Sequence, residues 1–273
     1  MTIDSSAMRQ RFPAQSVIEQ LLHEQGSTPP LSWYARLFGG SPLGVDGMPR
    51  YLGAKGEITV GALLETLPPD WIVFHAIPVA GRGADIDHLV VGPGGIFTIS
   101  SMHLSGTTGR HGADVWVGKR TMLVDGRTVP HLGDAEFVAE RVTNLVRERM
   151  PLLTPVQPVL ALVGPRRLTI ADKPEQVKVI DSRDLRRWLV KLHPVLSAGE
   201  VQEVSDLVDS PNTWRPLPLA ETDDDLMDRF TVLDARVRSA GIRRLLWAVG
   251  GPAVAIGGSI AVLHALEATR LAG

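Results

Sequence analysis

The sequence predicts an α/β (α+β) domain in which helices flank a mixed β-sheet, followed by a C-terminal transmembrane helix. Helical and strand-like segments alternate between residues 51 and 194, and the strand-like segments are short, apolar and bounded by glycine and proline turns. A further observation predicts the membrane helix: residues 245–266 run for about 22 positions without a formal charge, close to the ~20 needed to span a bilayer.

The composition narrows the classes of function. Hydrophobic residues make up 44% of the 273 positions, which is enough for a packed core. The net charge of −2 gives no overall basic signature for nucleic acid, although a local basic groove is compatible with it. The chain has no cysteine, which excludes disulfides and thiolate catalysis and favours a reducing compartment. The N-terminus lacks an apolar core, so we expect no secretory signal peptide.

Residues 1–50 are expected to form a helical and loop arm, and the domain over 51–194 begins with a helix. That helix carries Ile58, Leu63, Leu64 and Leu67 on one face. Three strands are predicted after it, in the segments WIVFHAIPV, ADIDHLVVG and GGIFTIS, and the turn GPGG joins the last two.

The second half of the domain is predicted to continue with short strands in DVWVGKRTMLVDGRTV, where Asp125-Gly126 favours a two-residue hairpin turn. The segment DAEFVAERVTNLVRERM is predicted as a helix with Asp134 as its N-cap. Strands in VQPVLALVG and VKVIDS and a helix in RDLRRWLVKL complete the domain.

Residues 195–244 are predicted to form a helical, proline- and acid-rich linker that ends in a charged amphipathic helix. The stretch 245–266 follows as the transmembrane helix. Four arginines precede the stretch, so the positive-inside bias places the larger part in the cytoplasm and predicts a single-pass protein of the cell membrane. The small residues Gly250, Gly251, Gly257 and Gly258 would let two such helices approach and form a homo-oligomer. A buried hairpin, or two short helices broken at Gly250-Gly251-Pro252, is the alternative.

Residues suited to chemistry lie in the first helix of the domain and in two of its strands. The helix contains Gly53-x-x-Gly56-Glu57, and the next strand begins Ile86-Asp87-His88. A glycine turn then leads into Ile96-Phe97-Thr98-Ile99. In order, spacing and flanking apolar strands, these segments resemble the nuclease-related domain (NERD) family over roughly residues 50–190.

The resemblance implies a restriction endonuclease-like fold of the PD-(D/E)xK type, in which carboxylates hold a magnesium ion beside a scissile phosphate. Such an ion takes oxygen ligands and lowers the pKa of an attacking water. Asp85 and Asp87 are two residues apart and share a strand face, so with Glu57 they offer up to three carboxylates. These three residues are the candidate metal ligands, Mg²⁺ is the candidate cofactor, and nucleic acid is a candidate partner.

The sequence departs from the family where the second strand should end in I-E-x-K-N. The acid falls at Ser100, the lysine at Met102 and the asparagine at His103. A hydroxyl and a thioether do not replace a carboxylate and an ammonium beside a divalent cation, and losing one preorganised charged group commonly costs ~10²–10³ in rate. We therefore expect a catalytically degraded, membrane-anchored binding or interaction module in which Glu57 and Asp87 are remnants.

Two other functions stay open. In one, an active Mg²⁺-dependent nuclease uses a relocated base from Lys119, Arg120, Arg110 or His103. In the other, the fold is only a structural, oligomerising part of a membrane protein. The basic helix RDLRRWLVKLH either lines a phosphate-facing groove or is an ordinary solvated face.

Each candidate residue also has an ordinary structural role. Asp85 and Asp87 are suited to capping at a strand end, and Glu57 is favoured by the helix dipole in a first turn. His88 is expected to be a packed histidine bonded through one ring nitrogen.

Overall fold

A computed structural model describes residues 8–27, 29–44, 47–78, 85–104, 112–150, 155–214 and 223–271; the side chains at 27, 223, 224, 249 and 251–271 are outside this description. The chain forms two compact units, which are described separately. The first comprises residues 1–21 and 49–226, and the second comprises residues 22–48 and 227–273.

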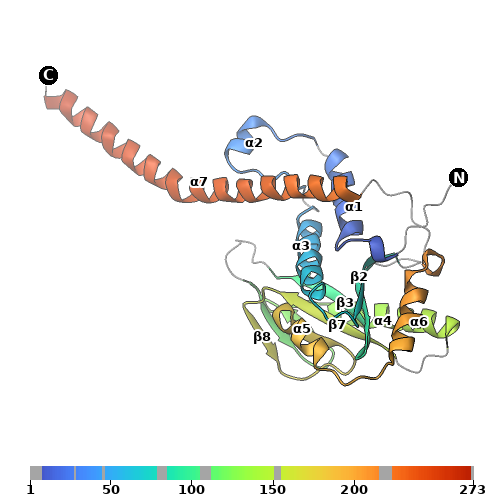
Figure 1. The fold of residues 1–273 in the computed structure, drawn as a ribbon. Helices are drawn as coiled ribbons and strands as arrows, with labels where there is room; N and C mark the ends of the chain where they lie inside the picture. Colours follow the sequence, from blue (N-terminus) through green and yellow to red (C-terminus); the bar gives the residue numbers. More distant parts are fainter. Residues whose placement is uncertain are drawn as a thin grey trace. The chain divides into compact units, whose positions relative to one another are not determined.

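A five-stranded mixed sheet forms the centre of the first unit (Figure 1). β1, β2 and β3 pair antiparallel, and β3, β7 and β9 pair parallel. The predicted mixed sheet is confirmed, including the tight turn that pairs Gly92 with Gly95. In sheet order the strands are β1 (Ile72–Ile77), β2 (Ile86–Gly92), β3 (Gly95–His103), β7 (Val156–Val163) and β9 (Lys178–Asp181).

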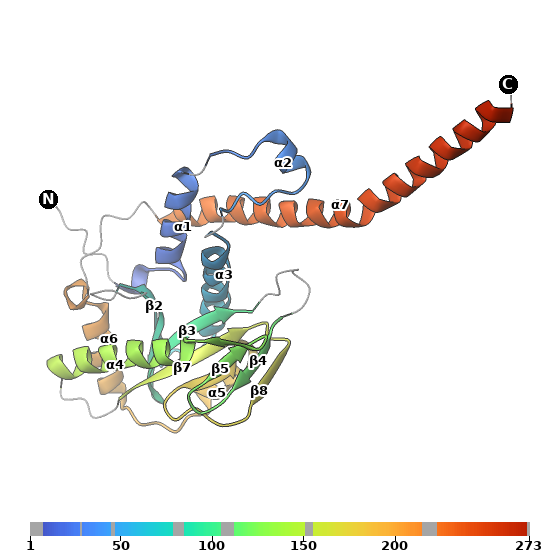
Figure 2. The ribbon, with the colours of Figure 1, turned by 180° about the vertical axis from the view of Figure 1, so that it is seen from behind.

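Helices cover both faces of this sheet, as predicted (Figures 1 and 2). On one face, α3 (Gly47–Leu64) and α5 (Ser182–Val190) pack over an apolar cluster that contains Phe97 and Ile99. On the other face, α4 (His131–Arg149) and α6 (Ala198–Asp209) pack over Leu89, Val91 and Ile96. We call the first the α3 face, because it carries the candidate site. The short 3-10 helices η1 and η2 span Met8–Gln10 and Pro211–Thr213.

A smaller four-stranded sheet has the order β6-β5-β4-β8 and packs against β7 through Leu160 and Leu162. Asp125 and Gly126 have φ values of 47° and 77°, which confirms the predicted tight hairpin turn. The strands are β4 (Asp114–Val117), β5 (Met122–Val124), β6 (Arg127–Val129) and β8 (Arg167–Ile170).

The second unit contains the end of α1 (Gln15–Ser27), the short helix α2 (Trp33–Leu37) and most of the long helix α7 (Asp223–Leu271). The sequence predicts an amphipathic helix up to residue 244 and a separate membrane helix after it. The structure instead has one continuous helix, because neither Gly250-Gly251 nor Pro252 interrupts it.

The predicted transmembrane helix over 245–266 is not supported by the structure. In the part of the chain that the structure describes, no helix is both long and apolar enough to cross a membrane. The side chains at 249 and at 251–266, which make up most of the predicted span, lie outside the described ones.

Candidate functional site

Glu57 lies on α3 and is buried, with 5% of its surface exposed. Its carboxylate accepts a hydrogen bond from the backbone N–H of Ala14, a residue in the N-terminal arm with φ of 67°. Burial, followed by the nearby charges of Asp87 and Asp85, raises the pKa of Glu57 well above its usual value. The three acids are therefore close enough to repel one another.

Asp87 lies near the start of β2, where the pairing with β1 is disturbed. The ladder pairs His75 with His88 and Ile77 with Ile86, and between these pairs Ala76 adopts the left-handed φ of 48°. The buried guanidinium of Arg11 donates through Nε to the carbonyl of Ala76 at 2.7 Å. The arm thus holds an unusual backbone conformation opposite Asp87, and such conformations persist only where their surroundings fix them.

Ser101 is the direct partner of Asp87. Its backbone N–H and its hydroxyl both donate to Oδ2 of Asp87, at 2.7 Å and 2.8 Å. Burial raises the pKa of Asp87 to about 6, although both Ser101 hydrogen bonds oppose this rise. Ser101 therefore stabilises a carboxylate that its surroundings otherwise disfavour.

The alternation of β3 decides which side chains can share the site with Asp87. Ile99, Ser101 and His103 pair with residues 159, 161 and 163 of β7, which belong to the apolar cluster on the α3 face. Ser100 and Met102 pair with Leu160 and Leu162, which belong to the cluster against the small sheet. Met102 itself packs against that second cluster. The strand therefore presents Ser101 and His103, and not Ser100 and Met102, on the face of Glu57.

The positions that the family pattern assigns to the missing acid and base lie elsewhere on this strand. The resemblance placed them at Ser100 and Met102, but in the structure both side chains belong to the opposite face of the strand. On the α3 face the corresponding pair is a hydroxyl and an imidazole. Neither face of this strand end offers a carboxylate or a lysine.

His103 lies beside α3, where a Cβ added to Gly56 would meet the backbone nitrogen of His103 at 3.3 Å. The glycine of the family pattern thus permits close approach of helix and strand. Burial, and then the charge of Lys55, lowers the pKa of His103. Lys119 and Arg120 lie between β4 and β5, and no described contact links them to Asp87. Arg110 lies outside the described residues.

The comparison with protein families agrees with this geometry. The sequence model of the nuclease-related domain family matches residues 52–163, from α3 to the end of β7. The chain contains a nuclease-related domain (NERD) over these residues. The match includes Glu57, Asp87, Ser101 and His103. Comparisons with curated proteins and with solved structures returned no match.

The donor set of this nuclease-related domain does not fit a magnesium centre well. Glu57 is buried with a raised pKa, and one oxygen of Asp87 already accepts two hydrogen bonds. Among the described residues, no three His, Asp or Glu side chains are grouped so that they could hold a metal ion. The metal role of Asp85, Asp87 and Glu57 stays a prediction of the sequence.

A buried histidine pair supports the strands next to the site. Nδ1 of His75 and Nδ1 of His88 are 2.8 Å apart, so one ring donates and the other accepts. Burial lowers the pKa of His75 to about 4, and burial together with His75 lowers that of His88. The single contact of His88 matches its predicted structural role. The sequence did not identify His75 as the partner of His88. The signal was the position of the two histidines, 13 residues apart on neighbouring antiparallel strands.

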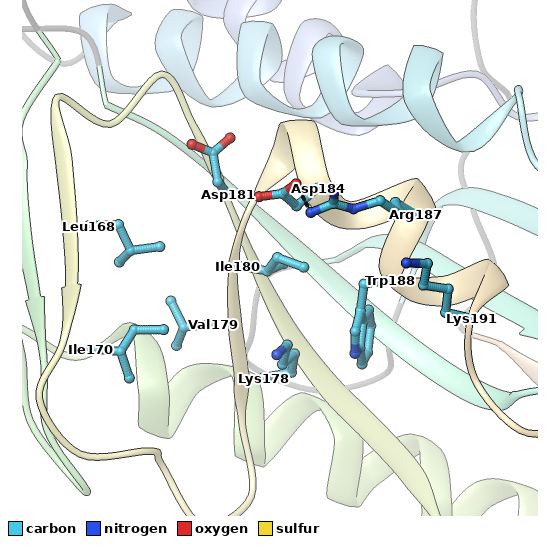
Figure 3. A pocket seen from close by; sticks show the side chains of 10 residues that line it. All are labelled: Leu168, Ile170, Lys178, Val179, Ile180, Asp181, Asp184, Arg187, Trp188 and Lys191. Carbon is cyan, nitrogen blue, oxygen red and sulfur yellow. Dashed lines mark hydrogen bonds and ion pairs between the residues drawn. The ribbon is translucent and has the colours of Figure 1, made fainter.

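The first unit also has a groove of about 540 Å³ between β8, β9 and α5, which follow the matched segment in sequence (Figure 3). Leu168 and Ile170 lie on one side, and Trp188 lies on the other with Lys178 Nζ 5.4 Å from its ring centroid. Asp184 pairs with Arg187 at 2.9 Å, whereas no ion pair of Lys178 or Lys191 is found among the described residues. The groove thus combines an aromatic ring, apolar side chains and two lysines without a carboxylate partner.

The Ser101 hydroxyl provides a test of the site. Ser101→Ala removes one donor to Asp87 and raises the pKa of that carboxyl further, so the folded protein should lose about 1 kcal/mol of stability at pH 8. The loss should shrink toward pH 4, where Asp87 is protonated. Urea unfolding at both pH values measures it. Ser100→Ala, on the opposite face, is the control and should change stability by less than about 0.5 kcal/mol; a larger loss for Ser100→Ala would contradict the assigned faces.

Proposed function

We propose that the first unit, which contains the nuclease-related domain, is a binding module that holds single-stranded nucleic acid without cleaving it. The Asp87–Ser101 contact is the observation that supports binding without cleavage. The side chain that reaches Asp87 from β3 is a hydroxyl, and the next residue on that face is a histidine with a lowered pKa. A phosphodiester-cleaving centre needs charge stabilisation that these groups do not supply at neutral pH.

The groove beside α5 supports nucleic acid as the ligand. A strand of nucleic acid presents bases that stack on aromatic rings and phosphates that attract lysines. Trp188, Lys178 and Lys191 provide both kinds of contact in one concave surface. The overall charge of −2 makes this a local feature of the groove. The acids Asp181 and Asp184, which also line it, are bonded to Arg183 and Arg187.

The purified full-length chain tests the proposal. A labelled single-stranded oligonucleotide should bind at low salt and should stay intact with Mg²⁺ or Mn²⁺ present. Lys178→Ala combined with Lys191→Ala should weaken binding by about tenfold and reduce the salt slope by about two, because each phosphate contact contributes about one. Lys173→Ala, an exposed lysine on the loop outside the groove, should leave binding unchanged.

Two results would overturn this proposal. Metal-dependent cleavage that disappears in Asp87→Ala would establish the second candidate function, an active nuclease with a relocated base. The observation that favours that candidate is the position of His103 beside Gly56 of α3 and near the charge of Lys55. No retention of nucleic acid at low salt would instead favour a structural role. Localisation at the cell membrane and oligomerisation through the small residues after 249 stay predictions of the sequence.

A further inference from the structure

The second unit contains a pocket of about 870 Å³ with three arginines in its wall. Arg36 comes from α2, and Arg236 and Arg243 lie about two turns apart on α7. Trp33, Leu37 and Pro30 form an apolar part of the same wall. We call this the arginine pocket.

The wall made by residues 29–43 is fastened to α7 by hydrogen bonds. Arg244 donates through Nε and Nη2 to the carbonyl of Gly39 at 3.3 Å and 3.0 Å, and Trp247 Nε1 donates to the carbonyl of Leu37 at 3.0 Å. Gly39 has φ of 78°, and a Cβ there would lie 2.5 Å from the carbonyl oxygen of Ala240. The pocket is therefore formed before any ligand binds, which lowers the entropic cost of binding.

The positive charges in the arginine pocket are not compensated within the described part of the chain. None of the residues that line it is acidic. Among the described residues, no ion pair is found for the three arginines, whereas Arg238 on the same helix pairs with Asp234 at 3.0 Å. Nε of Arg243 is buried and has no hydrogen-bond partner within the described part of the chain. A ligand with anionic oxygens would relieve the repulsion and satisfy this donor.

The apolar surroundings indicate that the anion belongs to a larger amphiphile. Trp33 is 62% exposed, and Tyr34, Phe38 and Leu246 of the same unit are also more than half exposed. Free phosphate would use only the guanidinium groups and leave these side chains in water. Tryptophan and tyrosine are enriched where a membrane meets water, and arginines there contact lipid phosphates.

We propose that the arginine pocket binds the phosphate headgroup of an anionic phospholipid at a membrane surface. The guanidinium groups of Arg36, Arg236 and Arg243 hold the phosphate oxygens. Trp33 and Leu37 contact the glycerol and the upper part of the acyl chains. This surface is made only of residues of the second unit, whereas the groove beside α5 belongs to the first.

The full-length chain and vesicles of defined composition test the proposal by flotation. The uncharged stretch 245–266 would associate with vesicles whatever their headgroup. The readout is therefore the amount bound to vesicles that contain phosphatidylglycerol divided by the amount bound to vesicles of phosphatidylcholine alone. Arg236→Gln combined with Arg243→Gln should lower this ratio by about 25-fold, because each arginine near an anionic surface contributes on the order of a fivefold change. Arg238→Gln, paired with Asp234 outside the pocket, is the matched control and should keep the ratio.

Trp33→Ala gives a second, independent variant, since an exposed side chain is replaced with little effect on folding. It should lower binding to anionic vesicles while the thermal unfolding curve stays the same. An unchanged ratio in the double arginine variant would overturn the proposal. Saturable binding of inorganic phosphate or glycerol phosphate, without preference for anionic vesicles, would overturn the lipid assignment in favour of a soluble phosphate.

Discussion

Replacing Asp87 with asparagine is expected to stabilise the folded protein at pH 8 by about 2 kcal/mol. The folded protein binds the Asp87 proton more tightly than the unfolded chain does, since burial raises the pKa from 3.8 to about 6. Stability is therefore lost as pH rises from about 4 through 6, because the buried group must ionise. A rise of this size corresponds to roughly 2–3 kcal/mol, and we take the lower value because the side chain is only half-buried. Asparagine can still accept from the Ser101 N–H.

The pH dependence separates this explanation from a general effect of the substitution. The gain should be absent near pH 4, grow through pH 6 and level off above it, and urea unfolding at several pH values measures it. Asp172→Asn, at an exposed position, should change stability by less than about 0.5 kcal/mol at every pH. A loss of stability at pH 8 in Asp87→Asn would mean that the ionised carboxylate has a partner, such as a bound cation, that the proposed binding module does not require.

The histidine pair is expected to make stability depend on pH in the opposite direction to Asp87. For this reason the effect of Asp87 is measured as a difference between variants and not from the wild-type protein alone. The pKa values of His75 and His88 are lowered, so their contribution is present above pH 6.5 and is lost as pH falls toward 4. Over the same window the protonation of Asp87 and Glu57 stabilises the folded state. The total pH dependence of the wild-type protein is therefore a partial cancellation.

Much of the sheet could be predicted from the sequence, because its strands and turns are determined by residues that are adjacent in the chain. Apolar runs of the length of β2 and β3, bounded by glycine turns, define strands whatever surrounds them. The Asp125-Gly126 turn is equally local. The family pattern also points to Glu57 and Asp87. In the structure these two carboxylates are close enough for the charge of Asp87 to raise the pKa of Glu57.

The assignment of faces could not be taken from the family pattern alone. The pattern counts residues, whereas the face on which Asp87 meets β3 depends on the left-handed Ala76 in the neighbouring strand. The hydrogen bond from Arg11 to Ala76 joins residues 65 positions apart. Similarly, the arginine pocket joins α2 to α7 across about 200 residues, with no local signal in either segment.

The N-terminal arm contacts α3, and two glycines of that helix test how closely the arm supports the site. A Cβ at Gly61 would lie 2.3 Å and 2.7 Å from ring atoms of Pro13, whereas a Cβ at Gly53 would meet nothing within 4 Å. Pro13 cannot move independently, because Ala14 beside it donates to Glu57 and Arg11 holds Ala76. Overpacking of this kind costs about 1–3 kcal/mol.

Gly61→Ala is therefore expected to lower the free energy of unfolding by about 1–2 kcal/mol, after the gain in helix propensity is subtracted from the overpacking cost, and Gly53→Ala to raise it by about 0.5–1 kcal/mol. Both substitutions gain the same helix propensity. The difference between their changes in the free energy of unfolding therefore measures the contact with the arm. Urea unfolding at pH 7 measures both. In Gly61→Ala the displaced arm no longer donates to Glu57, so the loss should increase with pH as that carboxyl ionises. Equal stabilisation by both substitutions would mean that residues 11–14 do not rest on α3, and that the arm does not determine the backbone opposite Asp87.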